Sequence, residues 1–304
     1  MTYLHAIIIA ILQGISELFP VSSLGHAVLL PRLLHWGIDE KSKQWLAFLV
    51  ALHLGTAVAL LIYFRDEWIG VVQAFVRSVR NGQIGQEEDD RLAWMVILGT
   101  IPAGLVGFVL EHPLRSLFGS PYTAAAFLMV NGVIMFVGER LLQRQALERA
   151  VSAHASARTA DGGAVALAPP GGGRYRDITQ LSWRDAAIVG FAQIGALIPG
   201  ISRSGITMVA GLAAGLTHEA SARYTFLLAT PIIAAAGLLE IPQLFDQSGR
   251  SVLGQAMVGM VLAGIAAYFA VRFLMRYFDD GKLYPFAYYC VAAGAVSILL
   301  LSIT

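Results

Sequence analysis

The charged residues of this 304-residue chain are gathered between long uncharged windows. A bilayer core about 30 Å thick needs about 20 apolar residues for one helical crossing. The shortest window contains Pro231, which a membrane helix tolerates when its neighbours satisfy the freed carbonyl. The pattern predicts an all-α polytopic membrane protein with six full spans. The windows without Asp, Glu, Lys or Arg are residues 45–64, 92–110, 116–138, 224–239, 251–271 and 283–304.

Composition supports this class and excludes others. Hydrophobic residues make up 57% of the chain and charged residues 13%, whereas soluble domains carry about 25% charged residues. The net charge of +1 gives no overall field that would recruit nucleic acid. Cys290 is the single cysteine, which excludes a disulfide framework and a multi-thiolate metal site. We expect it to be a small buried residue.

Two further apolar stretches, residues 2–34 and 184–216, are interrupted near the middle by Pro and Gly, with ionisable residues beside the break. Helix, break, helix at membrane depth is typical of a re-entrant hairpin, whose broken backbone must be buried in protein or face a wet cavity. The first stretch has no Lys or Arg before Arg32 and no small-residue cleavage site. It is therefore a poor signal peptide, and we expect it to remain in the mature protein.

The orientation follows from the distribution of Lys and Arg. If both hairpins return to the side they entered, one side of the six spans carries 15 of these residues and the other side five. The positive-inside rule assigns the richer side to the cytoplasm. Part of the excess lies in residues 144–182, whose Ala-rich and Gly-rich composition predicts a flexible cytoplasmic loop.

The loop divides the chain into two halves, residues 1–143 and 183–304, that resemble each other. Aligning Pro20 with Pro199 pairs the segment "QGISELFPVSSLGH" with "QIGALIPGISRSGIT" when one residue is gapped. Each half is then one hairpin followed by three spans. Because three is odd, the second hairpin enters from the opposite face. The count predicts an inverted-topology repeat whose two broken elements meet near the midplane, where such folds hold their site.

Ionisable residues inside hydrocarbon need an explanation, because each costs from about 2.5 to over 10 kcal/mol. Glu17, His26 and Arg203 fall in the interrupted stretches. One interpretation is a structural ion pair between Glu17 and Arg203 that locks the hairpins without chemistry. It leaves a surrounding polar cluster unexplained, whose other members are Ser16, Ser22, Ser23, Ser202, Ser204 and Thr207.

The breaks at Pro20 and Pro199 predict that new helices start beside these polar residues. A helix N-terminus offers free N–H groups and about half a positive charge to an anion, and the Arg203 guanidinium is a planar fork suited to phosphate oxygens. Ser23 and His26 are three residues apart, hence on one helical face, where the imidazole would take the hydroxyl proton. The pattern predicts a phosphate site with a serine nucleophile. His53, inside a predicted span, is a further candidate for the cavity wall.

The segments "SELFPVSSLGH" and "PGISRSGIT" resemble the two signature segments of the bacterial undecaprenyl-pyrophosphate phosphatases, also called bacitracin-resistance proteins. This resemblance implies a periplasm-facing site in the bacterial inner membrane that removes the terminal phosphate of the polyprenyl pyrophosphate carrier. It implies Glu17 as the catalytic acid, Ser23 as the nucleophile, His26 as the motif histidine and Arg203 as the phosphate ligand. The supporting hydroxyls that it implies are Ser22, Ser202, Ser204 and Thr207.

Two positions depart from the family pattern. Gln13 stands where the family usually has a second Glu one turn before Glu17, and Leu24 stands where a hydroxyl often follows the paired serines. The family's metal dependence implies a divalent cation, Mg²⁺ or Ca²⁺, on Glu17. Because an amide offers an oxygen without charge, we expect weaker metal binding than with a Glu at this position. We expect Gln13 to contribute to substrate binding.

Two rival interpretations stay open from the sequence. A lipid-phosphate transporter would use the same inverted repeat and Arg203 to bind without cleaving. A purely structural membrane protein would use the buried charges only for packing. Within the phosphatase interpretation, the attacking group is either Ser23 or an activated water.

Overall fold

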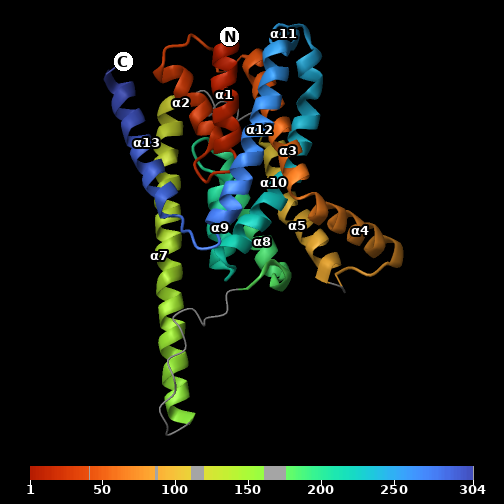
Figure 1. Ribbon diagram of the computed structural model, residues 1–304. Helices are drawn as coiled ribbons and strands as arrows, with labels where there is room; N and C mark the ends of the chain where they lie inside the picture. The colour runs from red at the N-terminus through yellow and green to blue at the C-terminus, as the bar shows by residue number, and fades with distance from the viewer. Residues whose placement is uncertain (41, 86–87, 111–119, 161–175, 304) are drawn as a thin grey trace.

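The computed structural model describes residues 1–40, 42–85, 88–110, 120–160 and 176–303. It is helical, and six of its helices are long and apolar enough to cross a membrane, which confirms the six predicted spans and a multi-pass membrane protein (Figure 1). The helices that contain these spans are α3 (Lys43–Tyr63), α5 (Glu88–Val109), α7 (Pro121–Ala160), α10 (His218–Phe245), α12 (Leu253–Tyr277) and α13 (Tyr284–Ile303).

Both interrupted stretches fold as helix, break, helix, as predicted. The first consists of α1 (Tyr3–Ser16) and α2 (Ser23–Leu33), and the second of α8 (Trp183–Ala192), the 3₁₀ turn η2 (Gln193–Leu197) and α9 (Arg203–Ala213). In Figure 1, α1 and α2 lie toward the end of the molecule that carries both termini, and α8 lies toward the opposite end. Re-entry into the bilayer and the inverted repeat themselves remain predictions.

The two breaks end in the same local structure. The hydroxyl of Ser22 caps α2 by accepting from the backbone N–H of Gly25 at 3.2 Å. The hydroxyl of Ser202 caps α9 by accepting from that of Gly205, also at 3.2 Å. Serine suits this position because its oxygen satisfies an N–H that the first helical turn leaves free. The two serine caps therefore start α2 and α9 at corresponding positions of the two similar sequence segments.

Glycine lets the second break pack tightly. Gly200 has φ +100°, a left-handed conformation that side chains rarely adopt, and a Cβ there would overlap the carbonyl oxygen of Ala124 in α7. The Cα of Gly200 would also lie 3.3 Å from a Cβ built at Gly25. The two breaks are thus in direct contact with each other.

One predicted boundary is wrong. Helix α7 continues to Ala160, so residues 144–160, predicted as part of a flexible loop, are helical. The reason lies in the local sequence, because this segment is rich in Ala and Arg, which favour helix, and has no Gly or Pro before residue 162. The Gly-rich run at 171–173 and the start of the window at 116 lie outside the described residues.

The long helices pack closely around the broken elements. Helix α3 lies between α10 and α12, α1 packs on α12, and α7 packs on α13. Small residues allow the approach, since a Cβ at Gly55 of α3 would overlap the carbonyl oxygen of Met260 in α12. Such contacts are typical of membrane helix interfaces. Cys290 is buried in this packing, as expected.

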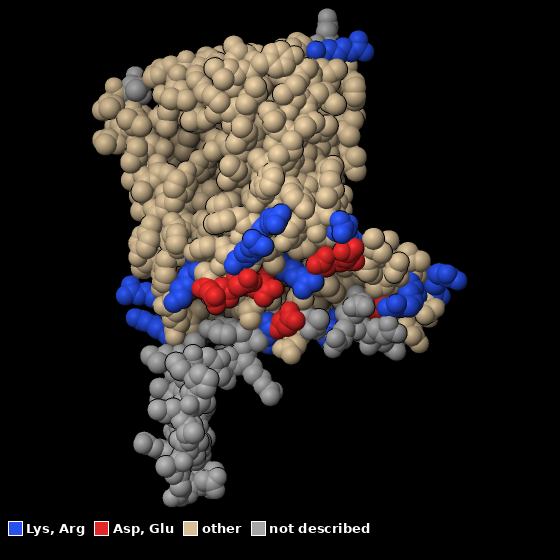
Figure 2. All heavy atoms as spheres, in the orientation of Figure 1, with Lys and Arg blue, Asp and Glu red and all other residues tan. Residues whose placement is uncertain are grey.

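Charged side chains gather at one end of the molecule. Figure 2 shows Lys, Arg, Asp and Glu in a band across its lower part, at the level of α4 (Arg65–Asn81), while the surface above is almost entirely uncharged. An uncharged belt next to a charged rim matches a bilayer core and its interface. The charged rim is the side that the sequence assigns to the cytoplasm.

Candidate functional site

A cavity of about 380 Å³ lies where the two breaks meet. Residues from α2, α3, α5 and α10 form an apolar wall, and polar side chains from the breaks and α3 form the rest. A site of this kind suits an amphiphile, because one part can hold a charged group and the other a hydrocarbon chain. The polar lining residues are Glu17, Ser22, Ser23, His53, Gln193, Ser202 and Arg203.

Glu17 and Arg203 form the central ion pair of this cavity. Arg203 donates through Nη2 to Oε1 of Glu17, and the two side chains are only 16% and 7% exposed, respectively. The guanidinium also donates through Nη1 to the carbonyl of Ala229 at 3.2 Å. A guanidinium has five N–H donors, so the pair leaves Arg203 able to bind an anion in the cavity.

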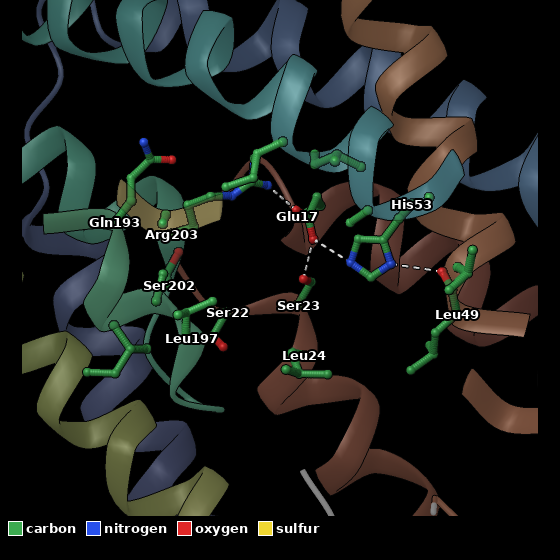
Figure 3. Close-up of a pocket in the computed structure, with 18 of the residues that line it drawn as sticks. Glu17, Ser22, Ser23, Leu24, Leu49, His53, Gln193, Leu197, Ser202 and Arg203 are labelled. Carbon is green, nitrogen blue, oxygen red and sulfur yellow. Dashed lines mark hydrogen bonds and ion pairs between the residues drawn. The ribbon is translucent and has the colours of Figure 1, made fainter. Parts of the chain in front are cut away.

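Ser23 is oriented by the same carboxylate. Its hydroxyl donates to Oε2 of Glu17, as Figure 3 shows. A serine hydroxyl on a carboxylate has a base in place to take its proton when the oxygen attacks. The structure thus brings together three predicted residues, Glu17, Ser23 and Arg203, around one cavity.

His53 and Gln13 complete the surroundings of Glu17. Nε2 of Gln13 lies 2.9 Å from Oε2 of Glu17 and 3.1 Å from Nε2 of His53. Nε2 of His53 is itself 3.3 Å from Oε2 of Glu17. Gln13 is 1% exposed and lies behind the lining residues, whereas the side chain of His53 is 28% exposed and lines the cavity (Figure 3).

The predicted pairing of Ser23 with His26 is wrong in this structure. Nδ1 of His26 lies 2.7 Å from the carbonyl oxygen of Ser22, one turn earlier, and Nε2 lies 2.8 Å from the hydroxyl of Tyr289 in α13. The ring is also stacked on Tyr289. Both ring nitrogens have partners other than Ser23, and His26 is not among the residues that line the cavity. The carboxylate of Glu17, rather than the imidazole of His26, receives the serine hydroxyl.

The other predicted hydroxyls divide into two groups. Ser22 and Ser202 line the cavity as the caps of α2 and α9. Ser204 donates to the carbonyl of Phe19 at 3.0 Å, which ties α9 to the first break. Thr207 donates to the carbonyl of Arg203, one turn earlier, at 2.6 Å. Ser204 and Thr207 are buried and do not line the cavity, so they support the site from behind.

Two functional positions were missed from the sequence. Asn131 of α7 donates to the carbonyl of Pro20 at 3.0 Å and accepts from the backbone N–H of Ser202 at 3.0 Å, so it joins the two breaks. The available signal was an Asn within an apolar span, since an amide buried there needs partners. Gln193 donates to the carbonyl of Gly99 at 2.7 Å and lines the cavity. The sequence signal for Gln193 was its position as the first residue of the segment "QIGALIPGISRSGIT".

The side chains around the cavity do not make a complete divalent-cation site. Within the described part of the chain, Glu17 is the only carboxylate that lines the cavity, and both of its oxygens have protein partners. Among the residues that the structure describes, no three His, Cys, Asp or Glu side chains lie together as a metal cluster would require. The free acceptor beside Glu17 is Oε1 of Gln13, which is buried and has no partner in the described part of the chain.

Known proteins resemble this chain over nearly its full length. Residues 6–296 match the family model described as "Bacitracin resistance protein BacA". A protein of Frankia alni named "Undecaprenyl-diphosphatase 2" is 44% identical over 97% of this chain and 97% of its own length. An "Undecaprenyl-diphosphatase" of Mycolicibacterium paratuberculosis is 45% identical over 100% and 98%. An "Undecaprenyl-diphosphatase 1" of Burkholderia pseudomallei is 46% identical over 95% and 93%. This chain therefore belongs to the bacitracin resistance protein BacA family.

Proposed function

We propose that this protein is a membrane phosphatase that hydrolyses undecaprenyl pyrophosphate to undecaprenyl phosphate and inorganic phosphate. The observation that carries the proposal is the convergence of Glu17, Ser23 and Arg203 on one cavity. The names of the relatives support the same activity. The released undecaprenyl phosphate would be reused as a lipid carrier for cell-wall synthesis.

Binding follows from the two parts of the cavity. The pyrophosphate lies at the polar end, where the free N–H groups of Arg203 and the N-termini of α2 and α9 attract its negative charge. The prenyl chain lies along the apolar wall from α3, α5 and α10. Since Arg203 keeps its contact with Glu17 through one nitrogen, phosphate binding does not require the ion pair to break.

The chemical step uses Ser23 as nucleophile and Glu17 as base. Oγ of Ser23 attacks the terminal phosphorus, its proton passes to Glu17, and the bond to the bridging oxygen breaks. Undecaprenyl phosphate leaves with that proton. Water then attacks the phosphoserine, Glu17 transfers a proton of the water to Oγ of Ser23, and inorganic phosphate departs. Arg203 stabilises the charge on the equatorial oxygens throughout.

A divalent cation, Mg²⁺ or Ca²⁺, is proposed to enter together with the pyrophosphate. Magnesium in phosphoryl-transfer sites is often held by one or two carboxylates plus substrate phosphates. Glu17 would be the single acidic ligand here, and the unpartnered Oε1 of Gln13 a neutral oxygen beside it. The protein residues alone make too few ligands, so the substrate must supply the others.

The site is proposed to face the periplasm of the bacterial inner membrane, between two re-entrant hairpins of an inverted repeat. The matching caps at Ser22 and Ser202 and the charge band of Figure 2 support this arrangement. Single cysteines in a Cys290→Ala background test it. A membrane-impermeant maleimide added to intact spheroplasts should label Gly37→Cys, between α2 and α3, and should leave Gly171→Cys unlabelled. The reverse pattern would contradict the orientation.

Phosphate release from undecaprenyl pyrophosphate in detergent, with and without chelator, tests the activity. Wild type and the exposed control Ser302→Ala should release phosphate. Arg203→Ala should lose about 10²–10³-fold in rate, as removal of a transition-state donor does, and Ser23→Ala should fall to background. Flipping of the lipid in proteoliposomes without phosphate release would instead identify a carrier.

A further inference from the structure

His53 touches the proposed base but has no part in the steps above. Its Nδ1 lies 2.8 Å from the carbonyl oxygen of Leu49, one turn earlier in α3. A carbonyl oxygen only accepts hydrogen bonds, so Nδ1 carries a hydrogen, and in the neutral ring Nε2 presents its lone pair. That lone pair lies 3.1 Å from Nε2 of Gln13. The helix therefore fixes the neutral ring of His53 as an acceptor for Gln13, and the same Nε2 lies 3.3 Å from Oε2 of Glu17.

Gln13 spans two acceptors with one amide. Its Nε2 has two hydrogens, and it lies 2.9 Å from Oε2 of Glu17 and 3.1 Å from Nε2 of His53. Rotating the amide by half a turn would place Oε1 against both acceptors. Oε1 is meanwhile left buried without a partner in the described part of the chain, which costs free energy. The two acceptors, rather than the needs of Oε1, set the orientation of Gln13.

The carboxylate of Glu17 is consequently held at two points. Arg203 holds Oε1, while Gln13 and Ser23 both donate to Oε2. With the Arg203 contact alone, the carboxylate could rotate about that contact and carry Oε2 away from the serine hydroxyl. The contact of Gln13 with Oε2 prevents this rotation, and Gln13 is held in turn by His53 of α3, which lies outside both hairpins.

We infer that His53, acting through the amide of Gln13, is a positioning residue that keeps Oε2 of Glu17 on the hydroxyl of Ser23. The inference rests on the proposed phosphatase activity. It assigns His53 an effect on the chemical step and little effect on substrate binding. Loss of the contact between His53 and Gln13 leaves Arg203 and the N-termini of α2 and α9, which are proposed to hold the pyrophosphate, unchanged.

Two substitutions of His53 separate this role from simple packing. Glutamine places its carbonyl oxygen near the position of Nε2, so His53→Gln keeps an acceptor for Gln13. Asparagine reaches only the position of Nδ1, so His53→Asn keeps the Leu49 contact and loses the acceptor. The matched control is His35→Asn, on an exposed residue whose φ of +51° asparagine adopts readily.

Steady-state phosphate release from undecaprenyl pyrophosphate gives kcat and KM for each purified variant. His53→Asn should lower kcat by about 10- to 100-fold, the usual result of slight misplacement of a reacting group, with KM changed by less than about twofold. His53→Gln should stay within about threefold of wild type, and His35→Asn should match it. Equal kcat values for His53→Asn and wild type, or equal losses in His53→Asn and His53→Gln, would overturn the inference.

A second pair of variants covers the case in which His53→Asn is poorly folded. Gln13→Leu removes both amide donors and should lower kcat to the same degree. If His53 acts only through Gln13, Gln13→Leu combined with His53→Asn should be no slower than Gln13→Leu alone, whereas additive losses would overturn the inference. A wild-type chain that releases no phosphate would contradict the proposed function itself.

Discussion

Replacing Glu17 by glutamine changes the site by one charge and almost no volume. The variant keeps a side chain of the same length beside Arg203 and Ser23 but removes the base that accepts the serine proton. General-base catalysis contributes about 10²–10⁴-fold to a rate. Each factor of ten corresponds to about 1.4 kcal/mol, so we expect Glu17→Gln to raise the barrier by about 3–5 kcal/mol.

The same change also has a cost in stability. Removing one partner of a fully buried ion pair typically costs about 3–5 kcal/mol. Arg203 is 16% exposed and lies on a cavity wall where water can reach it, so we expect about 2–3 kcal/mol here. A loss of activity must therefore be separated from a loss of folded protein.

Glu139→Gln is the matched control. Glu139 is 1% exposed, and its Oε2 lies 2.8 Å from Nε2 of His218 and 3.3 Å from the backbone nitrogen of Leu283. It is a second buried glutamate with a histidine partner, and it does not line the cavity. Both variants should unfold at a lower temperature, but only Glu17→Gln should lose kcat.

The assay is phosphate release by the folded fraction isolated by size-exclusion chromatography in detergent. A Glu17→Gln protein with kcat within about threefold of wild type, and a thermal midpoint lowered as in Glu139→Gln, would refute the assignment of Glu17 as base. General-base removal does not leave so much activity. The ion pair with Arg203 would then be purely structural.

Three further predictions concern the rest of the site. Gln13→Glu should shift the Mg²⁺ titration of phosphate release to lower concentrations, because a second carboxylate adds charge beside Glu17; an identical titration would remove that argument. Gly200→Ala should abolish folding or lower the thermal midpoint strongly, because its Cβ would overlap a backbone oxygen. In the control Gly37→Ala the new Cβ meets no atom within 4 Å, so the variant should lose only about 1 kcal/mol of stability for its φ of +63°. Equal thermal midpoints for the two variants would contradict the packing at the breaks. His26→Ala should lower kcat by less than about tenfold, far less than Glu17→Gln, because its ring nitrogens contact Ser22 and Tyr289 and not the hydroxyl of Ser23. A loss as large as that of Glu17→Gln would restore the imidazole as base.

The sequence predicted the spans and the meeting of Glu17 and Arg203 in one site for physical reasons, with an ion pair between them as one interpretation. Hydrocarbon excludes unpaired charge, so the long uncharged windows were predicted as spans, and Glu17 and Arg203 inside interrupted stretches pointed to one shared polar site. Helix ends were less accurate, because α7 continues on helix-forming residues after the apolar window ends. Propensity, rather than hydropathy, sets that boundary.

The spacing of residues along the sequence could not predict the contacts around the Glu17 carboxylate. Ser23 and His26 do share one face of α2, but spacing does not say which way the ring turns, and Tyr289 in α13 takes its second nitrogen. The contacts of Glu17 with His53 and of Asn131 with both breaks depend on residues far apart in the chain. Only the packing of α3 and α7 against the hairpins brings these groups together.

A single-turnover reaction tests the central claim most directly. Excess purified protein is mixed with undecaprenyl pyrophosphate labelled in its terminal phosphate, and the reaction is stopped with acid at increasing times. We predict that the label passes transiently onto Ser23 of the wild-type chain and then appears as inorganic phosphate, and that Ser23→Ala shows neither species. Release of inorganic phosphate by Ser23→Ala at the wild-type rate would contradict the account.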